Sequence, residues 1–213
     1  GRARDEIACV DVDTPEPAPE TMQPGPRLLR RLSHIEYQNT VATLFPYASD
    51  IELNFAPDNV VEDFSNNADA LIVSPLLSDQ YRETAETLGQ LFAQNIEYHL
   101  NCNPEDTGAT ACISDLLSNF GTQIFRRPLS SEEAQRYFDI WFSVASQDGY
   151  LLGIQWMATA MLQSPHFLYR SEIGRWQTAG HYALTSYEIA TELAYNLTGN
   201  PPDAALYAAA ASG

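Results

Sequence analysis

Apolar residues recur every three or four positions along most of the chain, which is the spacing of helices that bury one face. A clear example is the run Leu77, Tyr81, Ala85, Leu88 and Phe92. Related patterns predict one helix after Ser33 and further helices at about residues 112–126, 131–146, 149–164, 186–198 and 202–212. The hydrophobic pattern therefore predicts a helical body.

Residues that start helices precede these runs. A Ser or Thr followed three positions later by Glu has the spacing of a capping box, in which both side chains bond backbone amides at a helix N-terminus. The pairs are Ser33 and Glu36, Ser130 and Glu133, and Thr185 and Glu188. Ser74 before Pro75 is a further start, and Gly199 before Asn-Pro-Pro separates the last two helices.

Strand-like sequence is confined to ALIV, residues 70–73, which is too short to form a sheet on its own. We therefore expect an all-α fold, an irregular bundle of seven to nine helices. Residues 1–26 include DTPEPAPETMQPGP, which is acidic, Pro-rich and without periodicity, and they predict an extended arm or linker. In the helical body we expect a first subdomain at 27–101 and a second at 102–213, truncated at its C-terminal end.

Charge narrows the classes of function. The 213 residues carry 28 acidic and 11 basic side chains, a net charge of −17 that disfavours nucleic acid and anionic membrane surfaces as partners. All 11 basic residues are arginine, so chemistry that needs a lysine, such as a Schiff base, is excluded. No apolar run approaches the roughly 20 residues of a membrane span.

The three cysteines bear on the compartment. Cys102 and Cys112 flank the polar segment NPEDTGATA and predict a local disulfide, and hence a periplasmic or extracellular location. The alternative is a pair of reduced thiols in a cytosolic loop. A zinc site fits less well, because the spacing is not that of CxxC and His99 is the one soft ligand nearby. Cys9 is then free, or paired outside this chain.

The stretch MLQSPHFLYRSEIG, residues 161–174, is the first candidate site. Ser164-Pro165 should end the preceding helix and leave His166 at a break or tight turn. A histidine in such a place is more often a hydrogen-bonded packing residue, and no recognisable serine or cysteine nucleophile accompanies it. The enzymatic alternative is that His166 or His34 acts with a carboxylate as a general base. Arg170 should pair with another segment.

Other segments carry candidate ligands. Residues 56–70 hold a dense set of side-chain oxygens that would either bind calcium or serve as turn and cap residues. The calcium candidates are Asp58, Glu62, Asp63, Asn66, Asn67 and Asp69. Arg126 and Arg127 end a helix, where they oppose its dipole or bind an anion. The aromatic residues that follow predict core packing by their helical spacing; they are Tyr137, Phe138, Trp141 and Phe142.

Five segments in series resemble the blocks of one protein family. They are LLRRLSHIEYQNTVATLF, DFSNNADALIVSPLLSDQY, FGTQIFRRPLSSEEAQRYFDIW, MLQSPHFLYRSE and LTSYEIATELAYNLTGNPPDAAL. The family is a group of large exported proteins, abundant in planctomycetes and myxobacteria, built from domains of unknown function 1587, 1595 and 1592. Its members usually continue into a region with a CxxCH haem-c motif, and many carry cytochrome-like or carbohydrate-binding modules. This chain has no CxxCH and resembles the N-terminal half of a member.

The resemblance implies a non-catalytic helical scaffold or interaction module of an exported, haem-c-linked redox protein. We expect no cofactor in this chain and haem c in the C-terminal region of such a protein. The partner would be that region, a redox partner protein or a carbohydrate-associated protein. The alternatives are an enzyme that uses His166 or His34 with a carboxylate, and an assembly protein that engages a neighbour through the arm and Cys9.

Overall fold

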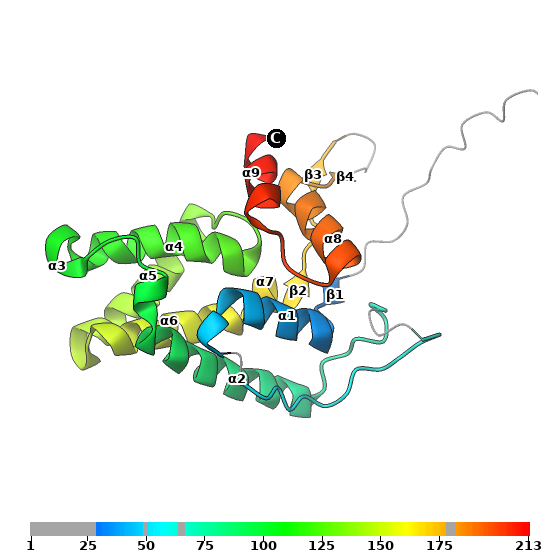
Figure 1. Ribbon diagram of the computed structural model, residues 1–213, viewed down its shortest axis with the longest axis horizontal. Helices are drawn as coiled ribbons and strands as arrows, with labels where there is room; N and C mark the ends of the chain where they lie inside the picture. The colour runs from blue at the N-terminus through cyan, green and yellow to red at the C-terminus, as the bar shows by residue number, and fades with distance from the viewer. Residues whose placement is uncertain (1–28, 49–50, 64–66, 178–181) are drawn as a thin grey trace, which may run out of the picture.

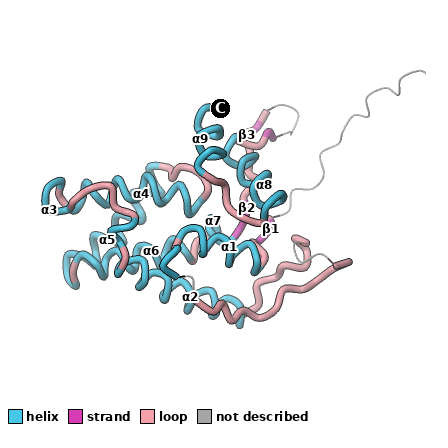
Figure 2. The backbone as a smooth tube through the Cα atoms, viewed as in Figure 1, coloured by secondary structure: helices cyan, strands magenta, loops and turns pink. Residues whose placement is uncertain are grey.

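The computed structural model describes residues 29–48, 51–63, 67–177 and 182–213 (Figure 1). Helices dominate these residues (Figure 2). In this described part of the chain the α-helices are α1 (His34–Leu44), α2 (Pro75–Gln94), α3 (Pro104–Thr107), α4 (Ala109–Phe125), α5 (Ser131–Asp148), α6 (Tyr150–Leu162), α7 (Pro165–Leu168), α8 (Ser186–Thr198) and α9 (Ala204–Ser212). Two 3-10 helices, η1 (Pro46–Ala48) and η2 (Ile96–Tyr98), follow α1 and α2. The predicted all-α fold is confirmed.

The predicted helix starts are present. Capping boxes begin α1, α5 and α8, with Ser33, Ser130 and Thr185 at the N-caps and a glutamate at the third helical position of each. Ser74 caps α2 ahead of Pro75 at its first turn. After α6 ends, Ser164 caps the single turn α7, so the chain breaks before His166, as expected. Side chains next to each start thus satisfy amides that the helix leaves unbonded.

One hydrophobic core joins most of the helices. α6 packs against both α2 and α5 (Figure 1). Gly89 permits the close approach of α2 to α6, because a Cβ atom at this position would lie only 2.7 Å from the carbonyl oxygen of Gln155. Residues of both predicted subdomains, 27–101 and 102–213, contribute to this core. The two parts are therefore packed together as one body.

The structure also contains two short strand pairs, which the hydrophobic pattern did not predict. β1 (Arg30–Arg31) pairs antiparallel with β2 (Tyr169–Arg170), with Arg30 opposite Arg170. β3 (Arg175–Trp176) pairs antiparallel with β4 (Tyr182–Ala183). Strands of two residues are too short to show an alternating pattern. The β1–β2 pair matters most, because it brings the start of the helical body against the segment that follows α7.

The aromatic residues of α5 divide between core and surface. Tyr137 and Trp141, four positions apart on one face, are buried, and Phe138 is packed against the core. Phe142 is 54% exposed, so the prediction that it belongs to the core is wrong. It follows Trp141 by one position, and consecutive helical residues point about 100° apart around the axis.

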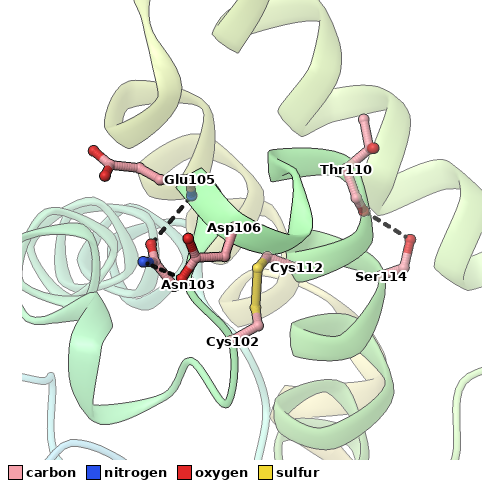
Figure 3. The surroundings of a disulfide bond; sticks show 7 residues. All are labelled: Cys102, Asn103, Glu105, Asp106, Thr110, Cys112 and Ser114. Carbon is pink, nitrogen blue, oxygen red and sulfur yellow. Dashed lines mark hydrogen bonds between the residues drawn. A yellow bond between two sulfur atoms is a disulfide. The ribbon is translucent and has the colours of Figure 1, made fainter.

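A disulfide joins Cys102 to Cys112 (Figure 3). Cys112 is fully buried on α4, and the loop between the two cysteines contains the single turn α3, whose N-cap is Asn103. The predicted bridge is thus present. It fastens the segment after η2 to the first turn of α4.

Cys9 and the predicted arm, residues 1–26, lie outside the described residues, so the predictions about them stay predictions. None of the helices in the described segments has the length and apolar character that a bilayer crossing requires.

We predict one free thiol per chain when thiols are counted under denaturing, non-reducing conditions, because Cys9 is the one cysteine outside the bridge. Replacing Cys102 and Cys112 together with serine should lower the free energy of unfolding by about 2–3 kcal/mol, since the unfolded chain gains conformational freedom. Urea denaturation measures this difference, with Cys9→Ser as the control that should leave stability unchanged. Three free thiols in the unreduced protein would contradict the bridge.

Candidate functional site

Arginines gather where β1 meets β2. Arg30 and Arg31 form β1, Arg170 ends β2, and Arg126 caps the C-terminal end of α4. The side chain of Arg170 is 0% exposed and that of Arg31 is 1% exposed. A buried charge is costly unless it is paired and hydrogen-bonded, so the partners of these guanidinium groups decide how this region is built. We call this cluster of arginines and their partners the arginine junction.

Arg170 links three parts of the chain. Its Nη1 donates to Glu36 Oε1 on α1 at 3.1 Å. Its Nη2 lies 3.2 Å from Glu192 Oε2 on α8 and donates to Asn196 Oδ1, also on α8, at 3.2 Å. The guanidinium carbon is 5.3 Å from the centre of the Tyr195 ring, within cation–π range. One side chain therefore fastens β2 to α1 and α8 at once.

Arg30 and Tyr195 strengthen the same contact. Arg30 Nη2 donates to Glu192 Oε2 at 2.6 Å, so two arginines share this carboxylate. The Tyr195 hydroxyl lies 2.7 Å from the Thr40 hydroxyl of α1. Burial raises the pKa of Tyr195 above its ordinary value, so the phenol stays protonated and can act as a hydrogen-bond donor.

Arg126 holds the end of α7 through backbone carbonyls. Its backbone is left-handed, with φ of 57°, which turns the chain out of α4. Its Nη2 donates to the carbonyl oxygens of His166, Phe167 and Tyr169 at 2.8, 3.0 and 2.9 Å. The prediction placed Arg126 at a helix end, where it would oppose the dipole or bind an anion. In the structure these donors serve carbonyls of this chain.

Arg31, His34 and Asp58 form a second charged group beside α1. Asp58 Oδ1 lies 2.6 Å from Arg31 Nη2 and 3.1 Å from His34 Nε2, and Asp58 Oδ2 accepts the His34 amide at 2.7 Å. Arg31 also donates to the Tyr81 hydroxyl at 2.8 Å. Burial lowers the pKa of His34, with Asp58 opposing and Arg31 adding to that effect. Asp58 thus ties the segment after η1 to the start of the body.

This arrangement bears on the calcium candidates. Asp58 turns toward Arg31 and His34, and Asn67 Oδ1 accepts the Asp69 amide in a local turn. Glu62 and Asp63 have left-handed backbone conformations, with φ of 50° and 67°. Asn66 lies outside the described residues. Among the residues that the structure describes, no three His, Cys, Asp or Glu side chains gather as metal ligands would.

His166 lies in a third group, with Arg127 and Glu133. Arg127 forms a bidentate pair with Glu133, with distances of 2.8 and 2.7 Å. His166 Nε2 faces Glu133 Oε1 at 3.2 Å, while Nδ1 is 3.3 Å from Arg127 Nη2. Hydrogen bonding from Arg127 is the main cause that lowers the pKa of Glu133 to about 2. Burial, followed by Arg127, lowers the pKa of His166.

The neutral imidazole fits this geometry. The Nδ1 lone pair accepts from Arg127, which leaves the proton on Nε2, the nitrogen that lies 3.2 Å from Glu133 Oε1. The structure therefore places His34 and His166 each beside a carboxylate, as the enzymatic alternative requires. It places them in separate groups, with His34 against the Phe55 ring and His166 against the Phe125 ring. Both carboxylates also bind an arginine, which offsets their charge.

The surface of α8 and α9 differs from the arginine junction in being apolar. Ile189, Leu193 and Leu197 follow one another at four-residue spacing on the outer face of α8 and are 47%, 48% and 79% exposed. A groove of about 250 Å³ runs between α8 and α9, with Leu206 and Ala209 contributing from α9. We call this surface the α8–α9 face. Exposed apolar residues in a continuous stripe are typical of surfaces that contact another molecule.

Three segments of the chain match protein families, each described as a protein of unknown function. Residues 30–94 match PSD3 (DUF1587), residues 112–172 match PSD5 (DUF1595), and residues 184–213 match PSD4 (DUF1592). The domain composition predicted from the sequence is thereby confirmed. No curated protein and no solved structure is significantly similar to the chain.

The arginine junction lies where these three segments meet. Glu36 belongs to the first matched segment, Arg170 to the second and Glu192 to the third. The sequence pattern indicated that Arg170 pairs with another segment, which is confirmed, but it identified neither partner. The sequence identified Glu36 as a capping residue only. For Glu192 it predicted a position in a helix and no partner.

We predict that Arg170→Met lowers the free energy of unfolding by about 3–5 kcal/mol, because it leaves the buried Glu36 carboxylate without its arginine and the half-buried Glu192 with Arg30 alone. Urea denaturation measures the change. Arg82→Met is the matched control: Arg82 pairs with Glu86 on the exposed side of α2, and its loss should leave stability almost unchanged. Equal losses of unfolding free energy from the two substitutions would show that the buried ion pairs of Arg170 stabilise the fold no more than an exposed pair.

We predict that the pKa of His166 in the folded chain lies below 6.5. The contribution of the neutral imidazole to stability is then fully present above pH 6.5. The unfolded chain binds the proton more tightly, so this contribution is lost as the pH falls from 6.5 through the lowered folded pKa. Imidazole NMR shifts give the pKa directly. Arg127→Met should raise the His166 pKa and Glu133→Gln should lower it further; shifts in the opposite directions would contradict the assigned contacts.

Proposed function

We propose that this chain is a non-catalytic helical scaffold of an exported, haem-c-linked redox protein, and that the α8–α9 face holds the haem-c-bearing region. The observation that carries the proposal is the exposed apolar stripe Ile189, Leu193 and Leu197 beside an apolar groove. Burial of such side chains against another molecule releases roughly 25 cal/mol for each Å² of apolar surface removed from water. A stripe at four-residue spacing suits the side of a partner helix.

Three further features support the parts of this proposal. The disulfide favours a periplasmic or extracellular location, because oxidising compartments are where such bridges persist. The link to haem c is supported by the resemblance of the five sequence blocks to proteins that carry a CxxCH region. The non-catalytic role is supported by the arginine junction, in which each arginine bonds a carboxylate or backbone carbonyls of this chain.

The enzymatic alternative retains one observation in its favour, since Nε2 of His34 and Nε2 of His166 lie 3.1 and 3.2 Å from a carboxylate oxygen. Against it, Asp58 is shared with Arg31 and Glu133 with Arg127, so an arginine beside each pair opposes the stabilisation that the carboxylate gives to a protonated imidazole. The assembly alternative, through residues 1–26 and Cys9, concerns residues outside the described segments.

We predict that the purified 213-residue chain shows no Soret absorbance, and that the native polypeptide carrying these residues, matured with haem c, does. The isolated chain should then bind the separately produced haem-c-bearing region of that polypeptide. Leu193→Asp should weaken this binding about tenfold or more, because it puts a charge into an apolar contact. Calorimetric titration measures the affinity.

Leu76→Asp is the matched control, since Leu76 is a similarly exposed leucine in the first turn of α2, away from α8 and α9. Equal losses from both substitutions would remove the α8–α9 face from the proposal. A native polypeptide without haem would remove the redox link. Substrate turnover by the 213-residue chain that disappears in His34→Ala or His166→Ala would favour the enzyme instead.

A further inference from the structure

The segment that contains β3, β4, α8 and α9 contacts the rest of the molecule in an unusual way. These elements stand together at one end, beside the β1–β2 pair (Figure 1). Of the residues in α8 and α9, both fully described, Tyr195 is the one that belongs to the connected hydrophobic core. The matched segment 184–213 covers these two helices and no part of the larger body. We call β3, β4, α8 and α9 the terminal unit.

Polar bonds hold the terminal unit in place. Glu192 pairs with Arg30 and Arg170, and Asn196 accepts from Arg170. Three more bonds reach the body: the Tyr195 hydroxyl to Thr40, the Asn39 amide group to the Gly199 carbonyl, and the Tyr207 hydroxyl to the Gln123 carbonyl. By contrast, α2, α5 and α6 are joined by large buried side chains such as Leu88, Trp141 and Ile154.

Polar and apolar contacts respond differently to separation. Exposing buried apolar groups to water costs free energy in proportion to the exposed area, and this cost opposes opening. A separated ion pair regains the hydration that burial removed from both charges, and this recovers much of the lost attraction. A unit joined to the body by two ion pairs and a few hydrogen bonds should therefore open at a smaller free-energy cost than the body that it rests on.

The connection to the body also permits such a movement. Residues 171–174 join β2 to β3 outside any helix or strand, and Gly174 there has a φ of 66°. The Gly174 amide donates to Glu188 of α8 at 3.0 Å, so this glycine is fastened to the terminal unit. A movement of the terminal unit would therefore be absorbed between Arg170 and Gly174. Hinges of this kind absorb a movement in a few backbone angles.

We infer that the terminal unit opens from the body as a whole on the Arg30–Glu192–Arg170 contact, with Glu192 as the latch. Opening uncovers Arg30 and Arg170 in a protein whose net charge is −17. It also carries the α8–α9 face away from the body. A role for this movement in docking the haem-c-bearing region on the α8–α9 face rests on the proposed function. The opening itself requires no partner.

Hydrogen exchange measured by mass spectrometry on the 213-residue chain tests the latch. Peptides from α8 and α9 should exchange at least about tenfold faster than peptides from α2 and α6, and should do so together. Glu192→Gln should speed exchange in α8 and α9 by about a further tenfold, because a hydrogen bond to a charged group is replaced by weaker neutral ones. Exchange in α2 and α6 should not change.

Two comparisons make the result decisive. High salt should speed exchange of α8 and α9 in the wild type and much less in Glu192→Gln, because the ion pair is partly exposed and is screened. Glu86→Gln, which removes the exposed pair with Arg82 on α2, is the control and should change neither group. Equal protection of all four helices at both salt concentrations, or equal acceleration of all four by Glu192→Gln, would overturn the inference. The wild-type salt comparison decides the matter even if Glu192→Gln fails to fold.

Discussion

A guanidinium group buried away from water must find acceptors in the protein, and Arg170 finds them on two other segments. Its position at the end of β2 is fixed by pairing with β1, and its acceptors lie on α1 and α8. Burying this one residue therefore fixes how three segments of the chain sit against one another. Desolvation of an unpaired charge costs several kcal/mol, which is comparable to the whole stability of many domains. The geometry of the junction is in this sense a condition for the closed arrangement of these three segments.

The parts of the fold that were predictable are those that depend on neighbours in sequence. Capping boxes, the Ser74-Pro75 start and the disulfide loop each rest on residues ten or fewer positions apart. The junction could not be predicted, because an ion pair between distant residues leaves no spacing to detect. Glu36 illustrates this: one oxygen accepts the Ser33 amide, as the capping box predicts, and the other accepts from Arg170. Asp58 likewise looked like a calcium ligand and faces Arg31 in the structure.

The two candidate histidines show how an arginine changes the meaning of a histidine–carboxylate pair. A carboxylate committed to an imidazole alone stabilises its protonated form and raises its pKa. Where an arginine already neutralises the carboxylate, that effect weakens and the arginine repels a proton on the ring. Both histidines have lowered pKa values, chiefly because they are partly buried, and Arg31 and Arg127 add to that effect. Burial and the neighbouring arginine thus outweigh the carboxylate in an arrangement that resembles a catalytic dyad, and they favour the neutral imidazole.

Arginine supplies every basic side chain of this sequence, and the junction uses a property of arginine that lysine lacks. A lysine ammonium concentrates its charge and donors at one nitrogen, whereas arginine spreads five N–H donors over a planar fork. Arg170 uses this fork to reach α1 with one terminal nitrogen and α8 with the other, and Arg126 gathers three carbonyl oxygens around a single nitrogen. A lysine at position 170 would offer Glu36 and Glu192 a single nitrogen, whereas the guanidinium group gives each helix a terminal nitrogen of its own.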